Sequence, residues 1–259
     1  MTTVLQLEQI SKQVFNESDR HTTILNQINL TVNKGDFITV LGGNGAGKST
    51  LFNAITGSTS VSGGQVSLKG KHLNTIKEEK RAAFIARVFQ DPKMGTAPRM
   101  TVAENLLLAL KRGQKPTLFS RGLNRHYDYF KSLCETIGNG LEEKLDVPTE
   151  QLSGGQRQSL SLLMATLTEP DVLLLDEHTA ALDPKIAVRL MELTDQIIHE
   201  KQLTCLMITH RMEDALKYGN RLIVLEKGSI KSDLNEKEKS ALSMDDLFHL
   251  FERDETPAP

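Results

Sequence analysis

Short alternating runs of hydrophobic and polar residues make up most of the first forty residues of the chain. The runs VLQLEQI (4–10), QINLTV (27–32) and DFITVLG (36–42) have the period of strands, with a turn between the last two. Two further short strands are predicted over 65–68 and 85–89. The amino-terminal part of the chain is therefore predicted to contain strands that are partly antiparallel.

The pattern changes to a helical period in the middle of the chain. From 101 to about 168 hydrophobic residues recur at helical spacing, and Thr101 and Glu104 have the spacing of a capping box. Gly, Pro and basic residues over 113–124 indicate a loop within this region. Helices are predicted over 49–55, from 101, near 124–137 and from 153 onward.

Strands and helices alternate again after residue 171, which is typical of crossover units and a parallel sheet. Because Pro92 and Pro170 roughly bracket the helical region, we expect a helical subdomain of about 93–169 inserted in an α/β core. We expect residues 1–240 to form one domain and 241–259 a short capped helix with a frayed tail. The predicted elements after residue 171 are strands at 172–176, 204–209 and 221–226 and helices at 184–200 and 213–219.

The composition is that of a globular protein. Of 259 residues 39% are hydrophobic, and the net charge of −2 gives no strong field toward nucleic acid or an anionic membrane. Cys134 and Cys205 are far apart in apolar or helical contexts, which indicates reduced thiols and not a disulfide framework. No run approaches the roughly 18 apolar residues of a membrane-spanning helix, and the first ten residues do not read as a secretory signal.

The string GGNGAGKST at 42–50 has the form of a phosphate-binding loop, G-x-x-x-x-G-K-[ST]. Its glycines let successive backbone N–H groups point at phosphate oxygens, and the helix that follows adds its positive end. Lys48 would place a charge on the β- and γ-phosphates, and the Ser49 hydroxyl would bind Mg²⁺. The residues expected to bind ATP or GTP are Gly42, Gly43, Asn44, Gly45, Ala46, Gly47, Lys48, Ser49 and Thr50.

Two adjacent acids, Asp176 and Glu177, end the apolar run VLLLDE. A wholly apolar run of this length suits a strand that is buried on both faces. Two acids at its end would be unfavourable unless a cation or a water network compensated them. We therefore expect Asp176 to hold Mg²⁺, directly or through water.

The string LSGGQRQ at 152–158 predicts a helix that begins at an anion site. Ser153 is placed to cap this helix, and the two glycines would leave its positive end uncovered. A γ-phosphate already belongs to Lys48, so two phosphate-binding devices for one nucleotide make sense if they come from different copies of the chain.

Together these strings resemble the ATP-binding cassette (ABC) ATPases, over roughly residues 4–232. The resemblance implies an α/β fold: a P-loop NTPase core with a mainly parallel sheet, an N-terminal antiparallel β subdomain and an inserted helical subdomain. It also implies ATP and Mg²⁺ as cofactors, with Ser49, Gln90 and Asp176 as metal-binding residues.

Residue roles follow from the same resemblance. Glu177 would be the general base or orient the attacking water, and His210 would touch the γ-phosphate and position that water. Gln90 would sense Mg²⁺ and water beside the surface that docks the membrane subunit. Phe15 would stack on adenine, although a core phenylalanine is an equally open alternative. Ser153, Gly155 and Gln156 would face ATP bound to the partner copy.

The resemblance further implies a homodimer that closes around two ATP molecules and drives a separate integral-membrane permease. The chain looks like an importer subunit at the cytoplasmic face of the membrane, working with an extracytoplasmic solute-binding protein and without nucleic acid. EHTAALDP and THRMEDALKYGNRLIVLEKG resemble importer cassettes of poorly defined cargo, some of which accompany binding proteins for amino acids, aromatic ones among them.

The chain departs from the family pattern in the loop after the acidic pair, and two alternative functions stay open. Where the family usually has Pro-Thr-Ser-Ala after the acidic pair, this chain has His178, Thr179, Ala180 and Ala181, so coupling between subunits is expected in altered form. A soluble ABC-type ATPase of cluster assembly stays open as a different class of function. A nucleotide-binding regulator without turnover is the other, and Glu177 with His210 argues against it.

Overall fold

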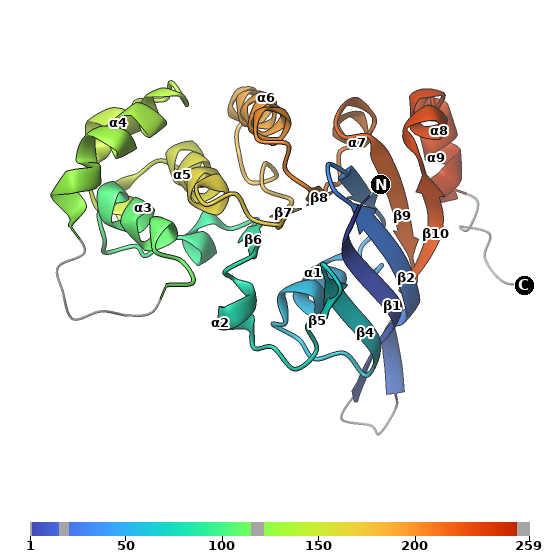
Figure 1. Cartoon of the computed structure of the whole chain (residues 1–259). Coiled ribbons are helices and arrows are strands. Elements are labelled where there is room, and N and C mark those ends of the chain that lie inside the picture. The colour runs from blue at the N-terminus through green and yellow to red at the C-terminus, as the bar shows by residue number, and fades with distance from the viewer. Residues whose placement is uncertain (1, 16–20, 115–121, 253–259) are drawn as a thin grey trace, which may run out of the picture. The chain divides into compact units, whose positions relative to one another are not determined.

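The structure is a computed structural model that describes residues 2–15, 21–114 and 122–252 (Figure 1). The chain forms two compact units. The first unit comprises Met1–Lys77 and Thr204–Pro259, and the second comprises Glu78–Leu203.

An antiparallel sheet of order β2-β1-β4-β5 belongs to the first unit. Hydrophobic residues alternate along β1, so that Leu5, Leu7 and Ile10 are fully buried and the residues between Leu7 and Ile10 are exposed. The prediction of antiparallel strands is confirmed, although β1 and β2 are longer than predicted. The strands are β1 (Thr3–Phe15), β2 (His21–Asn33), β4 (Gly63–Leu68) and β5 (Lys71–His72).

The first unit also contains the mostly parallel strands β10-β9-β3-β8. Every residue of β3 and β8 is buried, as expected of parallel strands covered on both faces. The elements here are β3 (Phe37–Leu41), β8 (Cys205–Ile208), β9 (Arg221–Glu226), β10 (Ser229–Leu234), α1 (Lys48–Thr56), α7 (Met212–Lys217), α8 (Glu236–Ser240) and α9 (Met244–Glu252).

The second unit contains two parallel strands, with helices before, between and after them along the chain. β6 pairs with β7 in a register that places Val88 opposite Leu175. The elements are β6 (Ile85–Val88), β7 (Val172–Asp176), α2 (Glu78–Arg81), α3 (Val102–Leu110), α4 (Tyr127–Glu135), α5 (Gly154–Thr166), α6 (Pro184–Glu200) and the 3₁₀ helices η1 (Pro92–Gly95), η2 (Leu123–His126), η3 (Leu141–Lys144) and η4 (Thr149–Gln151).

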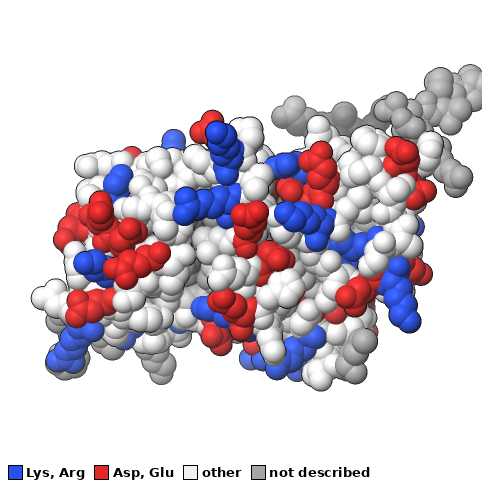
Figure 2. Space-filling view, turned by 90° about the horizontal axis from the view of Figure 1, so that it is seen from above, with Lys and Arg blue, Asp and Glu red and all other residues white. Residues whose placement is uncertain are grey.

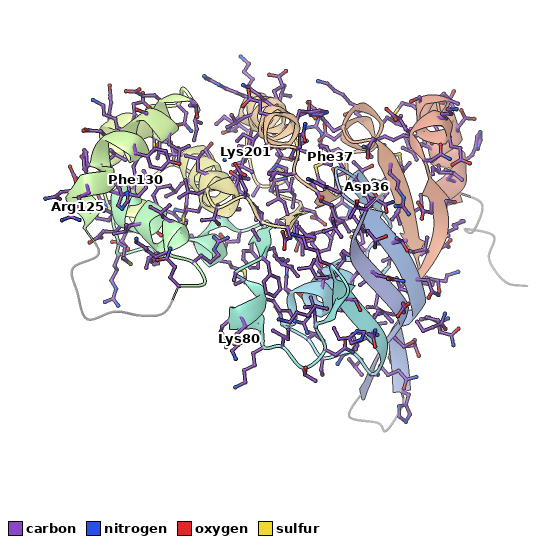
Figure 3. All side chains as sticks on the ribbon, viewed as in Figure 1. Asp36, Phe37, Lys80, Arg125, Phe130 and Lys201 are labelled. Carbon is purple, nitrogen blue, oxygen red and sulfur yellow. The ribbon has the colours of Figure 1, made fainter. Side chains whose placement is uncertain are left out.

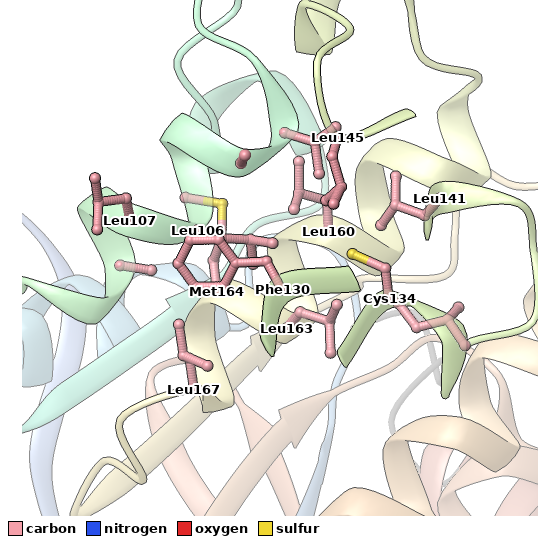
Figure 4. Packing of buried hydrophobic residues seen from close by; sticks show 14 of the residues in the cluster. Leu106, Leu107, Phe130, Cys134, Leu141, Leu145, Leu160, Leu163, Met164 and Leu167 are labelled. Carbon is pink, nitrogen blue, oxygen red and sulfur yellow. The ribbon is translucent and has the colours of Figure 1, made fainter. Parts of the chain in front are cut away.

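The helices α3, α4 and α5 enclose a hydrophobic core in the second unit (Figures 3 and 4). Phe130 of α4 is completely buried there, between leucines of α3 and α5. Cys134 belongs to the same core, and burial with nearby Glu142 and Glu135 raises the pKa of its thiol to about 12. Cys134 and Cys205 are both free, buried thiols, as the sequence predicted.

The helix caps predicted at Thr101, Ser153 and Ser243 are confirmed, and a further capping box that was not predicted lies at Asn235, at the start of α8. Thr101 and Ser153 each accept a hydrogen bond from the backbone three residues on, and the side chain at that position bonds back. Ser243 and Asp246 make the same exchange at the start of α9. The region from 101 to 168 is less continuous than predicted, because η3 and η4 interrupt the α-helices. The boundaries 93–169 and 1–240 stay predictions.

On the face in Figure 2, acidic and basic side chains are interspersed. This mixture agrees with the near-neutral net charge of −2. Within the part of the chain that the structure describes, none of the helices combines the length and hydrophobicity that crossing a bilayer requires.

Candidate active site

The phosphate-binding loop joins β3 to α1 in the first unit. Gly47 has φ +99°, and a Cβ on it would lie 2.8 Å from the carbonyl oxygen of Ile24. A Cβ on Gly42 would lie 2.4 Å from the carbonyl oxygen of Leu225. Real Cβ atoms do not come so close to backbone, so both positions require glycine.

A buried lysine is held against the carbonyl groups of the phosphate-binding loop. Lys48 is buried, and its Nζ donates to the carbonyl oxygens of Gly42 at 2.7 Å and Gly43 at 3.0 Å. Gly43, Asn44, Gly45 and Ser49 are exposed, Thr50 is partly exposed, and Ala46 and Gly47 are buried. Gly43, Asn44 and Gly45 are thus exposed just before a nine-residue helix, whose start suits an anion because the first N–H groups of a helix have no partner within it.

His210 lies in the same unit as this loop. β3 and β8 are parallel and pair Val40 with Ile208, so the loop and His210 both follow the carboxyl ends of neighbouring strands. Ligands of parallel α/β sheets bind at this edge. His210 is exposed.

Asp176, Glu177 and Gln90 occupy the corresponding edge in the second unit. β6 and β7 are parallel with Val88 opposite Leu175, so Gln90 and the two acids follow the ends of adjacent strands. Asp176 is only 8% exposed, Glu177 is partly buried and Gln90 is exposed. The structure therefore brings these three predicted residues to one edge.

Arg87, which sequence analysis did not single out, compensates the buried carboxylate. Its Nη2 lies 2.5 Å from Oδ2 of Asp176, and its guanidinium lies 4.8 Å from the ring centroid of Phe89. The sequence predicted compensation of this acid by a cation or a water network and named Mg²⁺, whereas the pairing with Arg87 was not predicted. A single charged residue within the apolar strand IARVF was the available signal.

Two features follow Asp176 along the chain. Glu177 has φ +48°, a left-handed conformation that residues with a Cβ rarely adopt. His178 is almost fully buried, and this burial lowers the pKa of its imidazole to about 4. The imidazole is therefore neutral in the folded protein near pH 7.

The helix α5 begins at Ser153 with a complete capping box. Ser153 and Gly154 are exposed, whereas Gly155 is buried and a Cβ on it would lie 2.8 Å from Cγ2 of Ile186 in α6. The structure thus differs from the expectation that both glycines leave the helix start uncovered, because α6 covers the second one. The Gln156 side chain accepts a hydrogen bond from the backbone N–H of Ser153 and donates one to the carbonyl oxygen of Asn139 at 3.0 Å. It therefore holds the helix start in place.

A cavity of about 370 Å³ opens beside the start of α5 within the second unit. Ser153, Gly155 and Gln156 form one side of it, and Lys185 and Arg189 of α6 contribute two positive charges. The cavity therefore combines a helix amino terminus with cations, which suits an anionic ligand.

Phe15 is the last residue of β1, and its side chain lies outside what the structure describes. Its expected contact with adenine stays a prediction.

A comparison with protein families gives the decisive observation. The model of the family described as "ABC transporter" matches residues 25–180. The chain belongs to the ABC transporter family.

Two relatives and a solved structure support this assignment across almost the whole cassette. A tyrosine transport ATP-binding protein of Clostridioides difficile is 45% identical, covering 96% of this chain and 99% of the relative. A putative hemin import ATP-binding protein of Staphylococcus haemolyticus is 34% identical, covering 88% and 99%. The dimeric structure of a bacterial ABC transporter cassette matches with a TM-score of 0.76 at 25% identity, covering 90% and 98%.

The cassette is thus an ATPase of the ABC family with the expected fold. Its predicted metal-binding groups fit Mg²⁺, because hydroxyl, amide and carboxylate oxygens are the donors that this cation prefers. Over the described ranges 2–15, 21–114 and 122–252, no cluster of three or more His, Cys, Asp or Glu side chains would hold a metal ion.

Proposed function

We propose that this chain is the ATP-hydrolysing subunit of an ABC importer and works as a homodimer on a separate membrane permease. The observation that carries the proposal is 45% identity, over nearly the full length of both chains, to a transport ATP-binding protein. Three motifs supply the groups that such a subunit needs: the phosphate-binding loop at 42–50, the acids Asp176 and Glu177, and the LSGGQRQ segment at 152–158.

ATP binding rests on the loop at 42–50. Its exposed backbone and the start of α1 receive the phosphates, and the Lys48 ammonium is held close to the loop. Ser49, Gln90 and Asp176 would hold Mg²⁺, which neutralises charge on the β- and γ-phosphates. Phe15 would stack on the adenine ring.

Hydrolysis rests on Glu177 and His210. Glu177 accepts a proton from the attacking water or orients it, and His210 positions that water against the γ-phosphate. Phosphoryl transfer needs positioning and charge stabilisation more than covalent chemistry, so these few groups suffice.

A homodimer accounts for the second anion site. Ser153 at the exposed start of α5, with Lys185 and Arg189 nearby, would receive the γ-phosphate of ATP held by the partner's loop. A dimeric relative with the same fold supports this arrangement. Each catalytic centre would then need both copies.

We infer import as the transport role and an amino acid as the cargo, the latter from the relative with 45% identity alone. The protein with 45% identity is described as acting in tyrosine transport, and the other relative as an import protein. We propose that the chain works at the cytoplasmic face of the membrane with a permease and an extracytoplasmic solute-binding protein. The transport and import roles of these two relatives favour an importer over the cluster-assembly alternative.

Replacement of Glu177 by Gln tests this function. The variant should bind ATP normally, accumulate ATP-bound dimers in gel filtration and lose at least about a hundredfold in turnover, because the general base is gone. Cells whose only copy is the variant should lose tyrosine uptake. Phosphate release at the wild-type rate would contradict the role of Glu177, and undiminished tyrosine uptake would contradict the cargo.

A further inference from the structure

His178, next to Glu177, is anchored to the middle of α6. Its Nε2 lies 3.0 Å from Oγ1 of Thr194, and the hydroxyl of Thr194 lies 2.7 Å from the carbonyl oxygen of Leu190 one turn earlier. His178 is 2% exposed and Thr194 is completely buried. The contact is therefore shielded from water, and its loss would leave a buried polar group without a partner.

The geometry assigns the proton of the imidazole. The carbonyl of Leu190 can only accept, so the single hydroxyl hydrogen of Thr194 goes to that carbonyl. Oγ1 of Thr194 must then accept a hydrogen from Nε2 of His178. His178 thus donates the first of two consecutive hydrogen bonds, and the second ends on the backbone carbonyl of Leu190 in α6.

Glu177 is held in an unfavourable backbone conformation between two fixed neighbours. Its φ of +48° disfavours a residue with a Cβ and persists only where the surroundings enforce it. Asp176 on one side belongs to β7, which pairs with β6. On the other side His178 is bonded to α6, and Ala180 donates its N–H to the carbonyl of Glu177 at 3.0 Å.

We propose that the hydrogen bond from His178 to Thr194 positions Glu177 for ATP hydrolysis by fixing the turn that begins at Glu177 onto α6. His178 is a positioning residue, since it acts through Glu177 and not on the nucleotide. The proposal rests on the proposed role of Glu177. It also gives a purpose to His178, which stands where the family usually has proline.

Four variants separate this role from a merely structural one. His178→Leu removes the donor and Thr194→Val removes the acceptor with little change in volume. His178→Gln keeps an N–H at similar reach, and Thr194→Ser keeps the hydroxyl. The measurements are kcat and KM for ATP at saturating Mg²⁺, the ATP-bound dimer fraction in gel filtration and the thermal midpoint, with Glu177→Gln in parallel.

We expect His178→Leu and Thr194→Val to lower kcat by about tenfold to a hundredfold, since small misplacement of a catalytic group has effects of this size. KM should stay within about twofold, because substrate binding is not touched. Both should accumulate ATP-bound dimers, as we also expect of Glu177→Gln. His178→Gln and Thr194→Ser should recover most of kcat, and the Leu/Val double variant should be no slower than the slower single variant.

Other outcomes overturn the proposal. If the two disruptive variants lose thermal stability while the folded protein keeps its kcat, the hydrogen bond is only structural. If His178→Leu does not fold, the nearly isosteric Thr194→Val decides alone. If Glu177→Gln hydrolyses ATP at the wild-type rate, the proposed function of Glu177 fails instead, which the parallel measurement makes visible.

Discussion

At the level of single residues, two buried ionisable groups flank Glu177, and different physics keeps each of them stable. Asp176 is charged and paired with the Arg87 guanidinium, whereas His178 is neutral and donates a hydrogen bond. A buried charge requires an opposite charge nearby, and a buried imidazole avoids that requirement by remaining neutral. The ion pair of Asp176 and the neutral imidazole of His178 therefore lead to separate predictions.

Replacement of Arg87 by Met should destabilise the protein. The side chains of Arg87 and Asp176 are 11% and 12% exposed, so the carboxylate would be left buried without its cation. The expected loss in unfolding free energy, measured by urea unfolding, is on the order of 3 kcal/mol.

The double variant Arg87→Met/Asp176→Asn should recover part of that loss, because no charge then remains uncompensated. Lys227→Met is a matched control, since the Lys227 side chain is 82% exposed and its ion pair with Glu226 is long, at 3.9 Å. An equal effect of Arg87→Met and Lys227→Met would show that the buried pair contributes nothing special.

The stability of the protein should fall with acidification through His178. Its pKa is about 4 when folded against an ordinary 6.5, so the unfolded chain binds more protons between these values. The contribution is complete above pH 6.5 and is lost as the pH falls toward 4, by about 3 kcal/mol in total.

Urea unfolding of wild type and His178→Gln between pH 4 and 7 measures this contribution. Glutamine does not titrate, so the variant should lack this part of the pH dependence. Parallel pH profiles of the two proteins would contradict the assignment.

At the level of elements, two helices of the second unit begin with the same capping box. Thr101 starts α3 and Ser153 starts α5, each with a side chain three residues on that bonds back. The Ser153 helix start borders the cavity that Lys185 and Arg189 also line, and Thr101 does not line that cavity. The same local structure therefore has two uses, which a pair of variants can separate.

Ser153→Ala and Thr101→Ala should each cost about 1 kcal/mol of stability, because each loses one cap. Only Ser153→Ala should also impair ATP-driven dimerisation and lower ATP turnover by about tenfold or more, since only that hydroxyl would meet a phosphate. Gel filtration with ATP and a phosphate-release assay give the comparison. Equal turnover in both variants would remove Ser153 from the proposed site.

At the level of the whole molecule, the proposed machinery is divided between the two units. The phosphate-binding loop and His210 belong to the first, and Gln90, Asp176, Glu177 and Ser153 belong to the second. In each unit the residues follow the carboxyl ends of parallel strands or start a helix. We propose that these parts form complete catalytic centres only when two copies of the chain associate as a homodimer.

Short-range chemistry could be read from the residues alone, because it depends on neighbours a few positions apart. The glycines and lysine of the loop, the acids at and just after the end of β7 and the caps at Thr101, Ser153 and Ser243 are of this kind. The parallel pairing also followed from the alternation of strands and helices. Element ends were less accurate, since 3₁₀ turns interrupt the helical period between α4 and α5.

Contacts between distant positions were decided only by folding. Arg87 meets Asp176 across 89 positions because β6 and β7 pair in parallel, and His178 meets Thr194 because α6 packs over the turn that precedes it. The burial of Gly155 against Ile186 has the same origin. A sequence shows that a buried acid needs a cation or a buried histidine a partner, but only the packing of the elements selects which residue provides it.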